Sequence, residues 1–175
     1  MSDAEPQAIR TRSEYRLGPP LEPGLADATP TGRPVVTFRR VEDADRERCA
    51  EVLLAAYRGT IDDEGETAAD ALAAMDHYLG VIDRPHSLVA FDGDAMVGFA
   101  FVVHVGGRPF VDPIVTVPDR KRTGLGRAVV AAVLDSLAAA GASEVGATIT
   151  DGNTAFERLF ASLGFRRVGP WPPAA

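Results

Sequence analysis

The sequence predicts an α+β domain built on a central mixed, mostly antiparallel sheet. Three observations indicate this class. Strand patterns follow one another across residues 87–117, joined by Asp-Gly and Gly-Gly pairs that favour hairpin turns. Apolar residues recur at helical spacing before and after that block. A Gly-containing loop then leads from the last of these strands into the most regular helical pattern of the chain, residues 127–140.

The composition fits one domain with a sizeable core. The chain has 175 residues, of which 46% are hydrophobic, so we expect no second domain. Its net charge of -7 argues against nucleic-acid binding. The longest strongly apolar run, residues 97–105, is too short to span a bilayer, and the N-terminus lacks a secretion-signal pattern. We therefore expect no membrane partner and a cytoplasmic location. The single cysteine, Cys49, excludes an internal disulfide and is expected in the core.

The first half of the chain divides into an arm and the start of the domain. Residues 1–34 are rich in Pro, Gly and charge without a sustained period, so we interpret them as an extended or flexible arm preceding a domain of residues 35–175. Residues 35–39 alternate as in a short strand. Helices are predicted at about 42–58, ended by Gly59, and at 67–79, ended by Gly80.

The second half continues the alternation of strands and helices. Strands are predicted at 87–91, 96–105 and 110–117, then the helix at 127–140 and a strand at 144–150. Thr154 has capping-box spacing with Glu157 and opens a short helix. A last strand is expected at 165–168.

Residues 118–127 form a Gly-containing loop that feeds directly into a helix N-terminus. Such a junction binds anions, because the first-turn N–H groups lack intrahelical partners and the helix dipole is positive there. Three basic residues, 120–122, crowd the same loop. The spacing is not that of a Walker loop, and Val129 stands where a dinucleotide fingerprint needs Gly or Ala. The residues themselves leave two interpretations open, a phosphate site or a solvated strand-to-helix turn.

At this point the sequence resembles the GNAT superfamily of acyl-CoA-dependent N-acyltransferases. The family signature, Arg/Gln-x-x-Gly-x-Gly/Ala, is similar to Lys-Arg-Thr-Gly-Leu-Gly at residues 121–126. A second family block corresponds to Asn153 followed by Leu163-Gly164-Phe165. The resemblance covers about residues 35–168. It implies a twisted sheet with helices on both faces.

The resemblance also implies a site for acetyl-CoA or another acyl-CoA. Backbone groups of residues 115–117 would meet the pantetheine arm, and N–H groups of residues 122–127 would hold the pyrophosphate. The thioester would lie between two splayed strands, 110–117 and 144–150, near Asn153. The cofactor-binding residues implied in this way are Val115, Thr116, Val117, Lys121, Arg122, Thr123, Gly124, Leu125, Gly126, Arg127 and Asn153.

Two positions depart from the family pattern. Lys121 replaces Arg or Gln, which should weaken bidentate pairing but spare a site made largely of backbone N–H groups. Phe160 stands where many relatives carry a Tyr that protonates the departing thiolate. Since a phenyl ring donates no proton, water or another side chain would have to do so.

Acyl transfer to an amine needs a base, because only a neutral amine attacks. Asp112, on the strand expected to face the cofactor, is one candidate, although it precedes Pro113 and could instead shape a bulge. His104, beside the Gly-Gly turn, is a second candidate or a solvated residue. Asp62, Asp63, Glu64 and Glu66 form an acidic run. Glu64 or a neighbour could be the base or attract a cationic acceptor, or the run could be a solvated loop.

The resulting hypothesis is transfer of an acetyl or short acyl group to a primary amine, with a small cationic molecule favoured as acceptor. Two alternatives stay open, an inactive acyl-CoA sensor and a protein acetyltransferase. No metal is expected. The oligomeric state is also left open, with a homodimer as one option.

Overall fold

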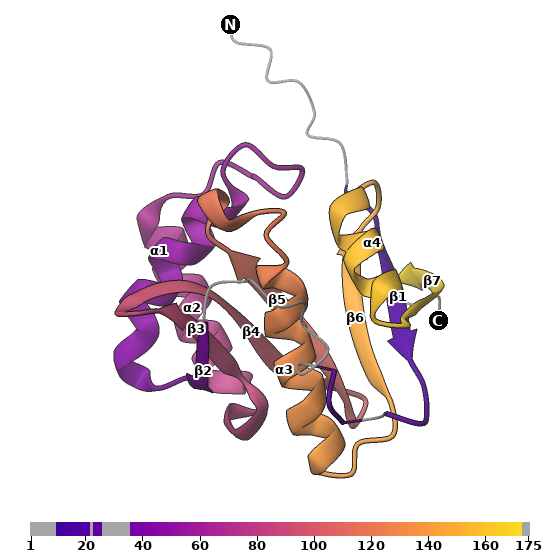
Figure 1. Cartoon of the computed structure of the whole chain (residues 1–175). Coiled ribbons are helices and arrows are strands. Elements are labelled where there is room, and N and C mark those ends of the chain that lie inside the picture. Colours follow the sequence, from indigo (N-terminus) through magenta and orange to yellow (C-terminus); the bar gives the residue numbers. More distant parts are fainter. Residues whose placement is uncertain (1–9, 22, 26–35, 173–175) are drawn as a thin grey trace, which may run out of the picture.

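In the computed structural model, residues 10–21, 23–25 and 36–172 are described, and they form one seven-stranded sheet flanked by four α-helices (Figure 1). The strand order is β2-β3-β4-β5-β6-β1-β7. The strands are β1 (Arg12–Leu17), β2 (Thr37–Arg40), β3 (Leu88–Asp92), β4 (Ala95–Val105), β5 (Arg108–Thr116), β6 (Val145–Thr150) and β7 (Arg166–Trp171). The α-helices are α1 (Arg46–Tyr57), α2 (Ala68–Val81), α3 (Leu125–Ala139) and α4 (Thr154–Ser162), with short 3-10 turns η1 (Asp43–Asp45), η2 (Arg84–His86) and η3 (Pro118–Arg120).

Helices cover both faces of the sheet, which confirms the predicted α+β class. Alternate residues of a strand point to opposite faces. In β4, Phe99 and Phe101 accordingly pack with α1 and α2, whereas Ala100 and Val102 pack with α3. Among the described residues, no helix is both long and apolar enough to cross a membrane.

The sheet is antiparallel at every junction except the one between β5 and β6. This parallel junction has a single paired position, Phe110 with Gly146. Beyond it the two strands separate, as Figure 1 shows. The splay implied by the family resemblance is therefore present. The backbone groups that face the gap are left without a strand partner.

Residues 12–17 correct the interpretation of the N-terminal arm. They are not an appendage but strand β1, which pairs along its whole length with β6 and also with β7. Three of its residues, Ser13, Glu14 and Tyr15, are buried. The strand is not evident in the sequence because its buried residues do not alternate with exposed ones and include a serine and a glutamate. Of the remaining residues of the predicted arm, 1–9, 22 and 26–34 lie outside the described residues.

Smaller corrections concern helix ends. Gly80 does not stop α2, which runs to Val81 and ends where the N–H of Asp83 donates to the carbonyl of Val102 (2.7 Å). The N-cap of α4 is Asn153 rather than Thr154, since its side chain accepts from the N–H of Phe156 (3.3 Å). Cys49 is a core residue as predicted, with 0% exposure, and burial raises the pKa of its thiol to about 12.

The β5–β6 junction requires glycine at position 146. A Cβ on Gly146 would lie 2.5 Å from the ring of Phe110, which is itself 2% exposed. We expect Gly146→Val to lower the free energy of unfolding by about 1–3 kcal/mol through overpacking, measured by urea denaturation. Gly169→Val in β7 is the matched control, because nothing lies within 4 Å of a Cβ there. Equal stability of the two variants would contradict this account.

Candidate active site

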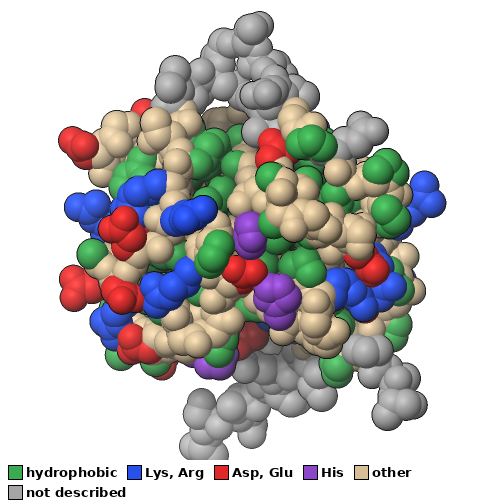
Figure 2. All heavy atoms as spheres, turned by 90° about the horizontal axis from the view of Figure 1, so that it is seen from below, with side chains coloured by type: hydrophobic (Ala, Val, Ile, Leu, Met, Phe, Trp, Pro, Cys, Tyr) green, Lys and Arg blue, Asp and Glu red, His purple; other side chains and the backbone are tan. Residues whose placement is uncertain are grey.

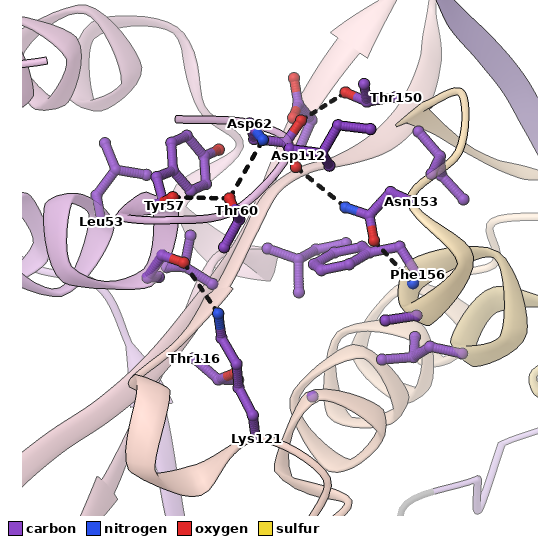
Figure 3. A pocket seen from close by; sticks show the side chains of 18 of the residues that line it. Leu53, Tyr57, Thr60, Asp62, Asp112, Thr116, Lys121, Thr150, Asn153 and Phe156 are labelled. Carbon is purple, nitrogen blue, oxygen red and sulfur yellow. Dashed lines mark hydrogen bonds between the residues drawn. The ribbon is translucent and has the colours of Figure 1, made fainter. Parts of the chain in front are cut away.

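A cavity of about 1030 Å³ opens where β5 and β6 separate. Its walls come from the end of α1, α2, the loop after α1, β5, the loop before α3, the end of β6 and the start of α4. Figure 3 shows side chains from these elements pointing into one space. The cavity therefore joins the predicted anion-binding loop to the candidate base Asp112.

Most of the predicted cofactor residues line this cavity: Val115, Thr116, Lys121, Arg122, Gly124, Gly126, Arg127 and Asn153. Three do not. Leu125 is buried in the core, the hydroxyl of Thr123 donates to the carbonyl of Arg120 (2.7 Å), and the N–H of Val117 donates to Val97 in β4 (3.0 Å). Because peptide groups alternate in direction along a strand, those of Thr116 point away from β4, toward the gap.

The loop before α3 presents a row of backbone N–H groups. Gly124, with a left-handed φ of 85°, is the N-cap, and the first helical hydrogen bond runs from Ala128 to its carbonyl (3.0 Å). Within the described part of the chain, the N–H groups of residues 122 and 124–127 have no hydrogen-bond partner. Five donors at a positive helix end are suited to binding an anion, as the sequence predicts. Gly126 keeps this site open, since a Cβ there would lie 3.0 Å from Leu159.

The side chain of Lys121 does not take part in this site. Its ammonium donates to the carbonyl of Ala56 at the end of α1 (3.2 Å) and so ties the loop to that helix (Figure 3). Arg120 is likewise engaged with Asp92. Lys121 lines the cavity as predicted, but its ammonium is hydrogen-bonded to α1, whereas Arg122 and Arg127 line the cavity beside the backbone N–H groups.

Asp112 lies in a bulge of β5. Two residues lie between Val111 and Ile114, whereas one lies between their partners Val102 and Ala100 in β4, so β5 carries one extra residue. Bulges redirect side chains, and the side chain of Asp112 lines the cavity (Figure 3). Burial raises the pKa of Asp112 to about 6, and the charge of Arg12 opposes this shift. The bulge considered for Asp112 is present, and the same position places a partly buried carboxyl in the cavity; its role as a base stays a prediction.

Two tyrosines from the helices, Tyr57 of α1 and Tyr78 of α2, line the cavity with Asp112. Burial raises the pKa of each phenol, and the charge of Asp112 raises it further, so both hydroxyls stay protonated. The sequence does not single them out, because Tyr57 fits equally well on the apolar face of its helix.

Carboxylates of the acidic run accept hydrogen bonds that hold the loop after α1 in place. Asp62 accepts from Thr150 (2.6 Å) and from Asn153 (3.0 Å), which fastens the loop to the far wall of the cavity (Figure 3). Asp63 accepts from the N–H groups of Gly59 (2.8 Å) and Gly65 (3.0 Å), and its pKa is lowered by them. These contacts favour the structural interpretation of the run.

Glu64 and His104, named as candidate bases, do not line the cavity. The side chain of Glu64 is 61% exposed and pairs with Arg10 (3.4 Å). His104 points from the end of β4 toward Asp83 (3.7 Å). The face seen from below in Figure 2 mixes charges of both signs with histidines. Of the three candidates named by residue, the structure brings only Asp112 to the cavity; from the acidic run, Asp62 and Glu66 also line it.

Phe160 does not line the cavity either. It has 0% exposure and packs edge-on against Phe165, with ring centroids 4.8 Å apart. The phenyl ring that stands in place of the family's Tyr is therefore buried in the core. Across the described segments, no group of three or more His, Cys, Asp and Glu side chains is placed to hold a metal ion.

Solved structures identify the class of fold as that of GNAT-type acetyltransferases. A GCN5-related N-acetyltransferase from Sphaerobacter thermophilus aligns with a TM-score of 0.70 and 18% identity over 94% of this chain and 50% of that one. A putative GNAT acetyltransferase from Desulfovibrio desulfuricans gives 0.60 and 24% over 75% and 86%. AAC(6')-Iy, in complex with the bisubstrate analog CoA-S-monomethyl-acetylneamine, gives 0.59 and 19% over 81% and 99%.

The chain spans half the length of the first of these structures. A search of curated proteins by sequence gives no match. The family model for the acetyltransferase (GNAT) family matches residues 46–165, and the chain therefore belongs to that family.

The raised pKa of Asp112 has a consequence for stability. Between its unfolded value of 3.8 and its folded value of about 6, the folded state binds more protons, so stability falls as pH rises through this window and then levels. Asp112→Asn removes this loss. Relative to the variant, the wild type should lose about 2–3 kcal/mol of unfolding free energy from pH 4 to pH 7, measured by urea titration. Asp94→Asn, in the exposed β3–β4 turn, is the control; the same pH trend there would argue against burial as the cause.

Proposed function

We propose that this protein transfers an acetyl or other short acyl group from acyl-CoA to a primary amine. One observation carries the proposal: a single cavity joins the N–H groups at the start of α3 that have no partner among the described residues to the partly buried carboxyl of Asp112. The N–H groups can bind a pyrophosphate, and the carboxyl can take the proton that an amine must lose before it attacks. The gap between β5 and β6 lies between them.

The donor side fits an acyl-CoA in two respects. The N–H row at residues 122 and 124–127 would hold the pyrophosphate, next to the cationic side chains of Arg122 and Arg127. The unpaired peptide groups of Thr116 in β5 would bind the amide-containing pantetheine arm, much as a strand would. When bound, the acyl-CoA supplies an acyl group activated as a thioester.

On the acceptor side, Asp112 would take a proton from the ammonium form of the amine. The neutral nitrogen then attacks the thioester carbonyl, the C–N bond forms and the C–S bond breaks. The nitrogen loses its second proton to solvent, and the departing thiolate takes up a proton to leave as the free thiol. Because Phe160 is buried away from the cavity, we assign this proton donation to a cavity phenol, with Tyr57 or Tyr78 as the donor.

The acceptor is proposed to be a small molecule. AAC(6')-Iy was solved with a bisubstrate analog that joins CoA to an acetylneamine, and this likeness supports a small-molecule amine as acceptor here. The carboxylates of the acidic run, however, are hydrogen-bonded within this chain, which weakens the argument for a polycationic acceptor.

Cofactor binding is tested by calorimetric titration with acetyl-CoA. Gly126→Glu places a carboxylate beside the N–H row and against Leu159, and should weaken binding at least about 30-fold, equivalent to about 2 kcal/mol. Gly80→Glu in α2 makes the same chemical change outside the cavity, with nothing within 4 Å of a Cβ, and should bind like the wild type. Wild type that binds no acetyl-CoA would overturn the proposed function.

The role of Asp112 is tested by the pH profile of kcat/KM. A base must be deprotonated, so the wild-type rate should rise with pH through about 6. Asp112→Asn should lower kcat roughly 100-fold or more and remove this limb, while acetyl-CoA binding is retained. A variant that keeps both the rate and the limb would show that Asp112 is not the base.

A further inference from the structure

We propose that the acceptor end of the cavity binds a carboxylate through the guanidinium of Arg12. This inference rests on the proposed function and adds the chemical class of a reactant. The carboxylate would be carried by the acceptor, as in an α-amino acid, or by the far end of a dicarboxylic acyl chain. Both sources share the same chemistry, and the experiment below separates them.

Arg12 reaches the cavity through the strand that the sequence did not reveal. It is the first residue of β1, where its Cα pairs with Thr150 of β6 and with Trp171 of β7. Thr150 is the last residue of β6 and itself lines the cavity. The side chain of Arg12 therefore lies at the open end of the gap and lines the cavity together with Asp112.

The guanidinium of Arg12 has no carboxylate partner within the described residues, unlike its neighbours in sequence. Arg10 pairs with Glu64 (3.4 Å) and Arg16 pairs with Glu14 (2.8 Å). No hydrogen bond or ion pair joins the Arg12 side chain to the described residues, and it is exposed. A guanidinium that lines a cavity and has no partner there offers parallel N–H donors, whose geometry matches the two oxygens of a carboxylate.

The carboxylates nearby do not use these donors. Asp62 accepts hydrogen bonds from Thr150 and Asn153, and Asp112 forms no ion pair with Arg12 within 4.0 Å. Arg12 lines the same cavity as Asp112, Tyr57 and Tyr78. Its positive charge opposes the rise that burial causes in the pKa of these three groups. The other arginines lining the cavity, at positions 120, 122, 127 and 158, belong to the loop before α3, α3 itself and α4.

The two groups at this end complement a reactant that carries both charges. Asp112 would receive the amine, and Arg12 would receive a carboxylate on the same molecule or on the acyl group facing it. A polyamine would instead bring additional positive charge toward Arg12, which like-charge repulsion disfavours. The other carboxylates that line the cavity accept hydrogen bonds within the chain: Asp62, Glu66 and Asp70. Because Arg12 has no such partner among the described residues, an acid-bearing reactant is favoured over the cationic acceptor expected from the sequence.

The test compares paired substrates on the full chain. In the first arm, acetyl-CoA is combined with alanine, phenylalanine or lysine and with the amines that lack their carboxylate, ethylamine, phenethylamine and cadaverine. In the second arm, these amines are combined with succinyl-CoA and with acetyl-CoA. In one of the two arms, the carboxylate should raise kcat/KM at least about tenfold, as expected for a charge-assisted bidentate contact. The arm that responds identifies the source of the carboxylate.

Variants connect this preference to Arg12. Arg12→Gln should lower kcat/KM for the carboxylate-bearing reactant by roughly 10- to 100-fold. It should leave kcat/KM for the matched reactant without a carboxylate nearly unchanged. Arg12→Lys should restore part of the loss, because it keeps the charge but not the fork. Arg166→Gln, an exposed strand arginine outside the cavity, is the matched control and should keep the wild-type preference.

Three results would overturn the inference: no carboxylate preference in either arm, a preference that Arg12→Gln leaves intact, or acetyl-CoA binding with no turnover of any pair. Each presupposes that the wild type binds acetyl-CoA in the calorimeter. Failure of that binding would instead refute the proposed function itself, so the two failures are distinguishable.

Discussion

The contact of Phe110 with Gly146 is the constraint on which the site depends. It is the single paired position between β5 and β6, and it holds the two strands together at one end. A partly buried ion-pair network reinforces the same end: Arg108 pairs with Glu14 of β1 (2.7 Å), and Arg16 of β1 pairs with Glu144 just before β6 (2.8 Å). Because the strands are joined here and diverge beyond, the sheet carries a cavity without losing its continuity.

The divergence leaves three kinds of unpaired polar group facing one space. The start of α3 contributes backbone N–H groups, β5 contributes peptide groups that no strand pairs with, and the bulge contributes the carboxyl of Asp112. Unsatisfied polar groups are unfavourable in a protein interior unless a ligand or water pairs with them. Their concentration in one cavity, with the core around it closely packed, is typical of a binding site rather than of a structural region.

Strand β1 brings an N-terminal segment into the sheet beside the cavity. It lies between β6 and β7, so that N-terminal residues complete the C-terminal half of the sheet. Its pairing with β6 brings Arg12 to Thr150, and Arg10 just before it pairs with Glu64 of the loop after α1. The end of the cavity that Arg12 and Asp112 line is thus assembled from segments far apart in sequence, which is why the acidic run alone is a poor guide to its chemistry.

Local structure could be predicted from the order of the residues alone. Two- and three-to-four-residue periods placed the strands and helices from residue 37 onward to within a few residues, and the Gly-containing loop before α3 predicted the N–H row now seen at residues 122–127. Which side chains face the cavity depended on the complete fold: Lys121 turns to Ala56, Glu64 turns to Arg10, and Arg12, Tyr57 and Tyr78 enter it. The difference lies in how far apart along the chain the interacting residues are. Periodicity and helix ends follow from neighbouring residues, whereas the partner of a charged side chain depends on which distant segment the fold brings beside it.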